Sequence, residues 1–218
     1  MIKLSKAGTL YTLTMNNGEN MICLDWQQRM LEILDQLEEA PVAGTAMVLI
    51  GEEKFFSNGL NLNVLNKLDG AGWILFAAQM NEIHRRMLML PFPTVAAVNG
   101  HAFAGGAFMA LSCDYRIMRE DRGWICISEV DAGVPLPQGM MEFLRLRLPT
   151  NTVRDAVLTG KRYDADDAIA AGFADGKAPA ELLLGMATEL ATDLACKEPS
   201  IFKAIKQAYY APIVAGLK

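Results

Sequence analysis

Hydrophobic and polar residues follow one another along the first half of the chain in patterns that predict strands. The segment GTLYTLTM, residues 8–15, alternates apolar and hydroxyl side chains, which is typical of a half-buried strand. The NNGEN that follows is typical of a turn. Two continuous apolar runs, TAMVLIG at 45–51 and TVAAVNG at 94–100, have the length of strands whose two faces are both covered.

Helical periodicity separates these strands. Asp25 is placed to cap a helix whose apolar residues recur at three- and four-residue steps over 26–37 and which Pro41 ends. Residues 73–90 predict a second helix, which Pro91 ends. The alternation continues with a short helix at about 105–113 and strands at 115–118 and 124–128. This order of elements predicts an α/β fold.

The last third of the chain is predicted to be mostly helical. Asp164 and Asp167 have the spacing of a helix cap, and Gly172 is a natural C-terminal stop for the same helix. The other expected helices cover residues 138–148, 152–159 and 180–199, and residues 200–218 are expected to form one more helix followed by a loose end.

Composition and charge exclude several classes of function. The chain has 218 residues, 52% of them hydrophobic, which fits one folded domain or one domain plus a short appendage. The net charge of -5 without a run of basic residues argues against a general nucleic-acid or anionic-membrane binder. Because no stretch of about 18 apolar residues and no leader pattern is present, we expect no membrane span and a cytoplasmic location. The four cysteines are scattered and predict buried free thiols, with neither a metal site nor disulfides.

Two loops share a design that suits chemistry at a carbonyl group. In KFFSNGLNL (54–62) and NGHAFAGGAF (99–108), a buried strand leads into a glycine-bearing turn that can present free backbone N–H groups. Two such donors that converge on one oxygen would form an oxyanion hole. Glycines alone serve equally well for tight turns or close helix packing, so this pattern leaves both interpretations open.

These two loops, in order with PTVAAVNGHAFAGGAFMALSCDYRIM (93–118), ISEVDAGV (127–134) and AVLTGKRYDADDAIAAGFAD (156–175), resemble the crotonase superfamily of enoyl-CoA hydratases and isomerases. The resemblance implies a spiral of β-β-α units over residues 1–175, followed by a short helical region at 176–218. It also implies an acyl-CoA thioester as substrate, no cofactor beyond the CoA of the substrate, and a homotrimer or hexamer.

The resemblance further assigns the site. The two oxyanion-hole donors would be the backbone N–H groups of Leu60 and Gly105. Residues expected to contact the substrate are Ser57, Asn58, Gly59, Asn61, Gly106 and Phe108. No metal ligand is implied.

Two glutamates carry the chemistry of the hydratases in this family, and only one is present here. The first corresponds to Phe108 and the second to Glu129. Hydration needs two carboxylates to position water and manage its proton, whereas moving a double bond needs one base that takes a proton and returns it elsewhere. The pattern is most similar to the peroxisomal-type Δ3,Δ2-enoyl-CoA isomerases, with Glu129 as the acid and base.

Four further residues have expected roles. In an extended strand Asp131 would share a face with Glu129 as a second carboxylate, although a turn or capping role is favoured. His84, in a charged helical stretch, is expected to be exposed, and His101 and Asp114 are expected to be structural.

Other functions remain open from the sequence. Members of the superfamily that lack the first glutamate include hydrolases, decarboxylases and dehalogenases as well as isomerases. A non-catalytic acyl-CoA binder or an oligomeric scaffold with the same fold is a third hypothesis.

Overall fold

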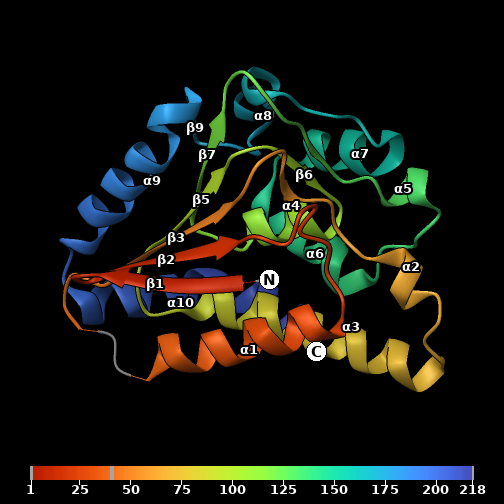
Figure 1. Cartoon of the computed structure of the whole chain (residues 1–218), viewed down its shortest axis with the longest axis horizontal. Helices are drawn as coiled ribbons and strands as arrows, with labels where there is room; N and C mark the ends of the chain where they lie inside the picture. The colour runs from red at the N-terminus through yellow and green to blue at the C-terminus, as the bar shows by residue number, and fades with distance from the viewer. Residues whose placement is uncertain (1, 40–41, 218) are drawn as a thin grey trace.

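Strands from most of the chain build two sheets in the computed structural model, which describes residues 2–39 and 42–217 (Figure 1). The strands are β1 (Ile2–Ala7), β2 (Leu10–Met15), β3 (Ala46–Gly51), β4 (Phe55–Ser57), β5 (Thr94–Val98), β6 (His101–Phe103), β7 (Tyr115–Arg119), β8 (Ile125–Cys126) and β9 (Gly176–Ala178). Among the described residues, the larger sheet has the order β1-β2-β3-β5-β7-β9 and the smaller one the order β4-β6-β8. Apart from the antiparallel β1–β2 pair, all these strand pairs are parallel.

Helices surround both sheets. They are α1 (Leu24–Glu38), α2 (Leu62–Leu65), α3 (Gly70–Met89), α4 (Gly105–Leu111), α5 (Glu129–Ala132), α6 (Gln138–Arg147), α7 (Thr150–Thr159), α8 (Ala165–Ala171), α9 (Ala180–Ala195) and α10 (Pro199–Gly216). The repeated passage from strand to strand to helix, and the helices after β7, agree with the predicted α/β spiral of β-β-α units with a helical C-terminal region.

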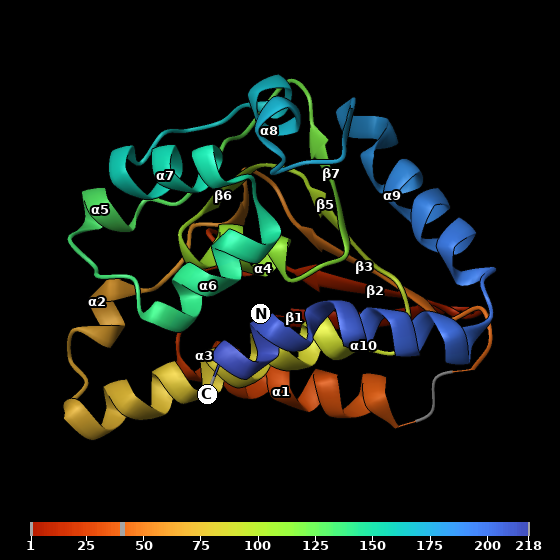
Figure 2. The same cartoon turned by 180° about the vertical axis from the view of Figure 1, so that it is seen from behind.

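Alternating side chains of the larger sheet face two separate cores. Met47 and Leu49 point into the main core with α1 and α3, while Val48 and Val95 point toward α9. The α9 side presents small residues at every fourth position, Ala187, Ala191 and Ala195, so the helix can approach the sheet closely. Figure 2 shows α9 on one side of the sheet and α1, α3 and α10 on the other.

The C-terminal region packs against the rest of the domain. Strand β9 pairs with β7 at the edge of the larger sheet. Helix α10 packs against α3 and α6 and lies across α3 when the molecule is seen from behind (Figure 2). The division at residues 175 and 176 stays a prediction.

Several predicted boundaries need correction. The first strand was expected at residues 8–15, but Gly8 has φ +62° and forms the turn of a β1–β2 hairpin. Helix α1 begins after Cys23, so Asp25 lies in its first turn, where a carboxylate interacts favourably with the helix dipole. Pro41, which was expected to end that helix, lies outside the described residues.

Other local predictions are confirmed. The Asp164 side chain accepts a hydrogen bond from the Asp167 amide at 2.9 Å, and Gly172 adopts the left-handed conformation at the end of α8. The cysteines of the described residues are free, and Cys113 and Cys126 are buried as expected. Cys196 is exposed, so for this thiol the expectation of burial is wrong, because the residue lies just past the end of α9.

Candidate active site

Three parallel strands of the smaller sheet end at a common edge, and each leads into one of the predicted site segments. Residues 58–61 follow β4, residues 104–106 follow β6, and residues 127–129 follow β8. The Ala104 amide donates a hydrogen bond to the Cys126 carbonyl oxygen at 2.9 Å, which fixes the second segment beside the third. The carboxyl edge of a parallel sheet is where α/β proteins commonly bind ligands.

The first loop is held by the turn at residues 17–22. The buried Ser57 hydroxyl donates to the Asn20 carbonyl oxygen at 2.7 Å and accepts from the Gly59 amide at 3.2 Å. On the other side, Ile22 donates to the Gly59 carbonyl oxygen at 2.8 Å and accepts from the Asn61 amide at 2.9 Å. These bonds leave the intervening Leu60 N–H without an acceptor in the part of the chain that the structure describes.

The second loop packs directly on the first. A Cβ atom placed on Gly59 would lie 2.7 Å from the Phe103 carbonyl oxygen and 3.3 Å from the Gly105 nitrogen. One placed on Gly106 would overlap with the Ser57 carbonyl oxygen. Glycine at these positions therefore lets the two backbones touch. The Gly105 N–H, like that of Leu60, has no acceptor among residues 2–39 and 42–217.

Backbone strain accompanies this junction. Ala104 has φ 47° and ψ −119°, a conformation that alanine rarely adopts. Such strain persists only where the surrounding structure imposes it and is common at functional sites. Here it accompanies the turn of the chain from β6 into α4, directly beside the loop after β4. Two free N–H groups on neighbouring loops are what an oxyanion hole requires, and their convergence on one ligand oxygen stays a prediction.

Glu129 is the first residue of helix α5, which follows the end of β8 at the same edge of the smaller sheet. The residue is 9% exposed, and its Oε2 atom is buried without a hydrogen-bond partner among the described residues. Burial raises the pKa of the carboxyl group to about 7, although a hydrogen bond from the backbone amide of Glu129 itself opposes the shift. A carboxyl group with this pKa can both accept and return a proton near neutral pH.

Asp131 is not a second carboxylate of the site. Residues 129–132 form a helix rather than an extended strand, so side chains two positions apart point to different sides. The exposed Asp131 carboxylate packs at Gly160, where a Cβ atom would lie 2.5 Å from its Oδ2 atom. The Asp131 backbone amide donates a hydrogen bond to the Ser128 carbonyl oxygen at 3.1 Å, as in a turn. The favoured turn role is the one that the contacts support.

Phe108, the position that the family resemblance matches to the first glutamate of the hydratases, lies in the core. It is 1% exposed, and its ring centre lies 5.6 Å from that of Phe143 and 6.1 Å from that of His84. No carboxylate is therefore supplied from this position of α4. A contact between Phe108 and substrate stays a prediction.

His84 is fully buried, so the expectation of exposure is wrong. The charged neighbours Arg85 and Arg86 occupy other faces of α3, while His84 falls on the apolar face four residues after Met80. Its Nδ1 atom lies 2.8 Å from the Ser112 hydroxyl, which itself donates to the Phe108 carbonyl oxygen. Nδ1 is therefore the protonated nitrogen, and burial lowers the pKa of His84 to about 4.

The other predicted site residues have defined local contacts. The Asn58 amide group donates to Glu19 at 2.7 Å, and Asn61 caps α2 by accepting from the Val64 amide at 3.3 Å. The His101 ring stacks on Phe103 and also lies 5.0 Å from the ring centre of Trp124, in keeping with a structural role. The contacts of Asp114 are also structural, as expected. Whether Ser57, Asn58, Gly59, Asn61 and Gly106 contact substrate stays a prediction.

Asn20 is a structural residue of the site that the sequence interpretation missed. Its side chain donates to the carbonyl oxygens of Phe55 and Phe56 at 3.1 and 3.2 Å, and its own backbone has φ 51°. Asparagine tolerates this conformation better than most residues. The available signal was the NNGEN turn, in which an asparagine follows a glycine by two positions.

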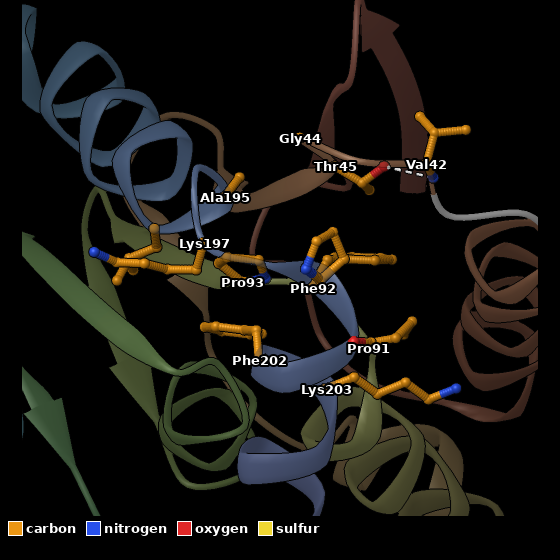
Figure 3. Close-up of a pocket in the computed structure, with 13 residues that line it drawn as sticks. Val42, Gly44, Thr45, Pro91, Phe92, Pro93, Ala195, Lys197, Phe202 and Lys203 are labelled. Atoms are coloured by element: carbon orange, nitrogen blue, oxygen red, sulfur yellow. Dashed lines mark hydrogen bonds between the residues drawn. The ribbon is translucent and has the colours of Figure 1, made fainter.

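A cavity of about 240 Å³ lies at the amino ends of β3 and β5 in the larger sheet. Thr45 and Pro93, which precede β3 and β5, line it together with Ala195 and Phe202 (Figure 3). The side chains of Lys197 and Lys203 extend in opposite directions in this view. These cations therefore do not converge on a common ligand. In the part of the chain that is described, no group of three or more His, Cys, Asp or Glu side chains is arranged to hold a metal ion.

The sequence of residues 5–217 matches the profile of a family described as enoyl-CoA hydratase/isomerase. The chain belongs to the enoyl-CoA hydratase/isomerase family. Its relatives include enoyl-CoA delta isomerase 2, peroxisomal, of Arabidopsis thaliana, which is 32% identical over 100% of this chain and 95% of the relative. Enoyl-CoA delta isomerase 3 of the same plant is 33% identical over 96% of this chain and 92% of the relative.

Solved structures of the enoyl-CoA hydratase/isomerase family share the fold. A probable enoyl-CoA hydratase from Mycobacterium tuberculosis superimposes with a TM-score of 0.92 at 27% identity, covering 99% of this chain and 91% of the other. The resemblance to the crotonase superfamily and the predicted fold class are thereby confirmed. The chain is a crotonase-type acyl-CoA enzyme by family. No helix of the described residues has the length and apolar character needed to cross a membrane.

One consequence of the buried carboxyl group concerns stability. The Glu129 carboxyl has a pKa of about 7 in the fold, against 4.5 as its ordinary value. The folded state therefore holds this proton more tightly, and stability falls as the pH rises from about 4.5 to about 7. Glutamine has no charge to desolvate, so Glu129→Gln is expected to be more stable than the parent by about 3 kcal/mol above pH 7.

Urea unfolding of both proteins between pH 4 and 8.5 checks this expectation. The difference in the free energy of unfolding should approach zero below pH 4.5. A difference that does not change with pH would contradict the burial of an ionisable Glu129.

Proposed function

We propose that the protein is a Δ3,Δ2-enoyl-CoA isomerase, which converts 3-enoyl-CoA thioesters to trans-2-enoyl-CoA. The observation that carries the proposal is the single buried carboxyl group, Glu129, at the edge where the free amides of Leu60 and Gly105 lie. Phe108 leaves no second carboxylate on α4 to activate water. Two relatives described as enoyl-CoA delta isomerases, at 32% and 33% identity, support the same function.

The proposed reaction begins at the thioester carbonyl group. The N–H groups of Leu60 and Gly105 donate to the carbonyl oxygen, which acidifies the C–H bonds at C2. The ionised Glu129 carboxylate takes one C2 proton, and the electron pair moves into the dienolate, with negative charge on the thioester oxygen. The two amides stabilise this charge without a metal ion.

The second half of the reaction returns the same proton. The protonated Glu129 donates it to C4, the dienolate electrons form the C2–C3 double bond, and the carboxylate is regenerated. Atoms and charge balance within substrate and enzyme, because no water is added and none is lost. A pKa near 7 suits a group that must act as base in one step and as acid in the next.

The pH dependence of this reaction follows from the state of the free enzyme. Because only ionised Glu129 can take the C2 proton, kcat/KM for 3-hexenoyl-CoA is expected to rise with pH through about 7 and to level off above it. The formation of the conjugated thioester, followed by its ultraviolet absorbance between pH 5.5 and 8.5, measures this profile. A profile without an inflection near neutral pH would contradict the role of Glu129 as base.

A hydratase is the second candidate, since one of the solved relatives is described as a probable enoyl-CoA hydratase. It would require water to be positioned by Glu129 alone. The proposed homotrimeric or hexameric assembly and the expected cytoplasmic location are separate proposals. One Arabidopsis relative is described as peroxisomal.

A further inference from the structure

Helix α4, whose first residue is Gly105, is held at its other end by side chains from three distant helices. From α3, His84 hydrogen-bonds Ser112, which follows α4 directly. From α6, the Arg147 guanidinium donates through Nη2 to the Cys113 carbonyl oxygen at 2.7 Å. From α10, Lys206 and Tyr210 reach Asp114. All of these contacts lie at the opposite end of α4 from the Gly105 N–H group.

Asp114 is the centre of this cluster. Its side chain is 8% exposed and forms a 2.7 Å ion pair with Lys206, whose side chain is 4% exposed. Through the same Oδ2 atom it accepts from the Thr94 amide at 2.9 Å and from the Thr94 hydroxyl at 3.0 Å. The Asp114 carboxylate thus ties α10 to the start of β5 and to the end of α4.

Tyr210 connects this carboxylate to the arginine. Its hydroxyl group donates to Asp114 Oδ1 at 3.0 Å and accepts from Arg147 Nη1 at 2.8 Å. The guanidinium carbon of Arg147 also lies 5.2 Å from the centre of the Tyr210 ring. The hydroxyl group therefore orients Arg147, which in turn holds the last carbonyl groups beyond α4. Among the described residues, no carboxylate forms an ion pair with Arg147, and Tyr210 supplies its side-chain hydrogen-bond partner, while Nη2 donates to the backbone oxygens of Cys113 and Asp114.

Helix α4 connects this cluster to the two glycine loops. All residues of α4 are buried, and a helix of seven residues is a stiff rod about 10 Å long. At its amino end, Gly105 and Gly106 pack on the first loop with no space for a Cβ atom on Gly106. A shift along the helix would therefore move the Gly105 N–H relative to the Leu60 N–H.

We propose that Tyr210 is a positioning residue, whose hydroxyl group fixes Arg147 and Asp114 and, through α4, the place of the Gly105 N–H in the oxyanion hole. The inference rests on the proposed function, because it assigns that N–H to the thioester oxygen. It gives the C-terminal helix a part in catalysis although α10 supplies no group to the reacting atoms.

The test removes one oxygen atom. Tyr210→Phe is expected to lower kcat for 3-hexenoyl-CoA about tenfold with KM within about twofold of the parent, because misplacement of a donor weakens transition-state binding most. Tyr209→Phe is the matched control, since Tyr209 is the preceding residue of α10 and is 65% exposed. Its kinetic constants should equal those of the parent.

A binding measurement separates this inference from the proposed function. A 3-oxoacyl-CoA has an acidic C2–H bond and can form an enolate, so its binding is expected to depend on the oxyanion hole more than that of a saturated acyl-CoA of equal length. The ratio of the two affinities should fall about fivefold or more in Tyr210→Phe and should not change in Tyr209→Phe. If the parent protein failed to isomerise but this ratio still fell, the function would be wrong and the positioning role would stand.

Two results would overturn the positioning role. One is an unchanged kcat and affinity ratio in Tyr210→Phe. The other is a loss of kcat with an unchanged affinity ratio and a lower melting temperature, which would mean that Tyr210 only stabilises the fold. If Tyr210→Phe does not fold, Arg147→Lys takes its place under the same criteria, since lysine lacks the rigid fork through which Nη1 and Nη2 donate to Tyr210 and to Cys113.

Discussion

Replacement of Glu129 by glutamine is expected to lower kcat/KM for 3-hexenoyl-CoA at least about a hundredfold, which is the scale that general acid–base catalysis contributes. Glutamine keeps the shape of the side chain but can neither take the C2 proton nor return it at C4. Because the variant is also expected to be more stable than the parent above pH 7, lost activity cannot be ascribed to unfolding. Steady-state kinetics at pH 8 with both proteins measures the effect.

Asp131→Asn is the matched control for this variant. It neutralises a carboxylate on the same short helix, α5, but one that is exposed and faces Gly160. Its kcat/KM should remain within about twofold of the parent. Full activity in Glu129→Gln would remove that residue from the mechanism, and an equal loss in both variants would point to the helix rather than to the buried carboxyl group.

Gly106→Ala is expected to lower kcat about a hundredfold or more. The added methyl group would overlap with the Ser57 carbonyl oxygen, so the loops that carry Leu60 and Gly105 would have to separate. Loss of one converging donor costs about a hundredfold to a thousandfold in kcat in enzymes with known oxyanion holes. Thermal unfolding should show a lower melting temperature, because overpacking at this junction also costs about 1–3 kcal/mol.

The control for Gly106→Ala is a glycine-to-alanine substitution at a position where the added methyl group meets no other atom. Gly185 lies in the interior of α9, is exposed, and would place no Cβ atom within 4 Å of another group. Gly185→Ala should leave kcat unchanged and add about 1 kcal/mol of stability through helix propensity. A folded Gly106→Ala protein with the parent's kcat would show that contact between the two loops does not matter for catalysis.

Long elements with a strong pattern could be predicted from the sequence, and short ones could not. The buried strands β3 and β5 and the helix α3 lie within one or two residues of their expected positions at most of their ends. Strand β1 was missed because only Ile2 of its six residues is fully buried, as expected of an edge strand. Helix α5 has four residues, fewer than periodicity can identify.

Some residues in and around the candidate site could be predicted from the sequence, and others could not. The glycine loops and Glu129 could be identified because their residue types and order are characteristic of a family. The buried His84 could not, since its neighbours in sequence are charged while its neighbours in space are Phe108 and Phe143. The ion pair between Lys206 and Asp114 joins residues 92 positions apart, and no local pattern records such a contact.

The central claim is that one buried glutamate shifts a double bond without adding water. The most direct test gives the same enzyme sample 3-hexenoyl-CoA and trans-2-hexenoyl-CoA in separate reactions and identifies the products by chromatography and mass. We expect rapid conversion of 3-hexenoyl-CoA to the conjugated 2-isomer and little or no 3-hydroxyhexanoyl-CoA from either substrate. Formation of 3-hydroxyhexanoyl-CoA from the 2-isomer at a rate comparable with isomerisation would contradict it and establish a hydratase instead.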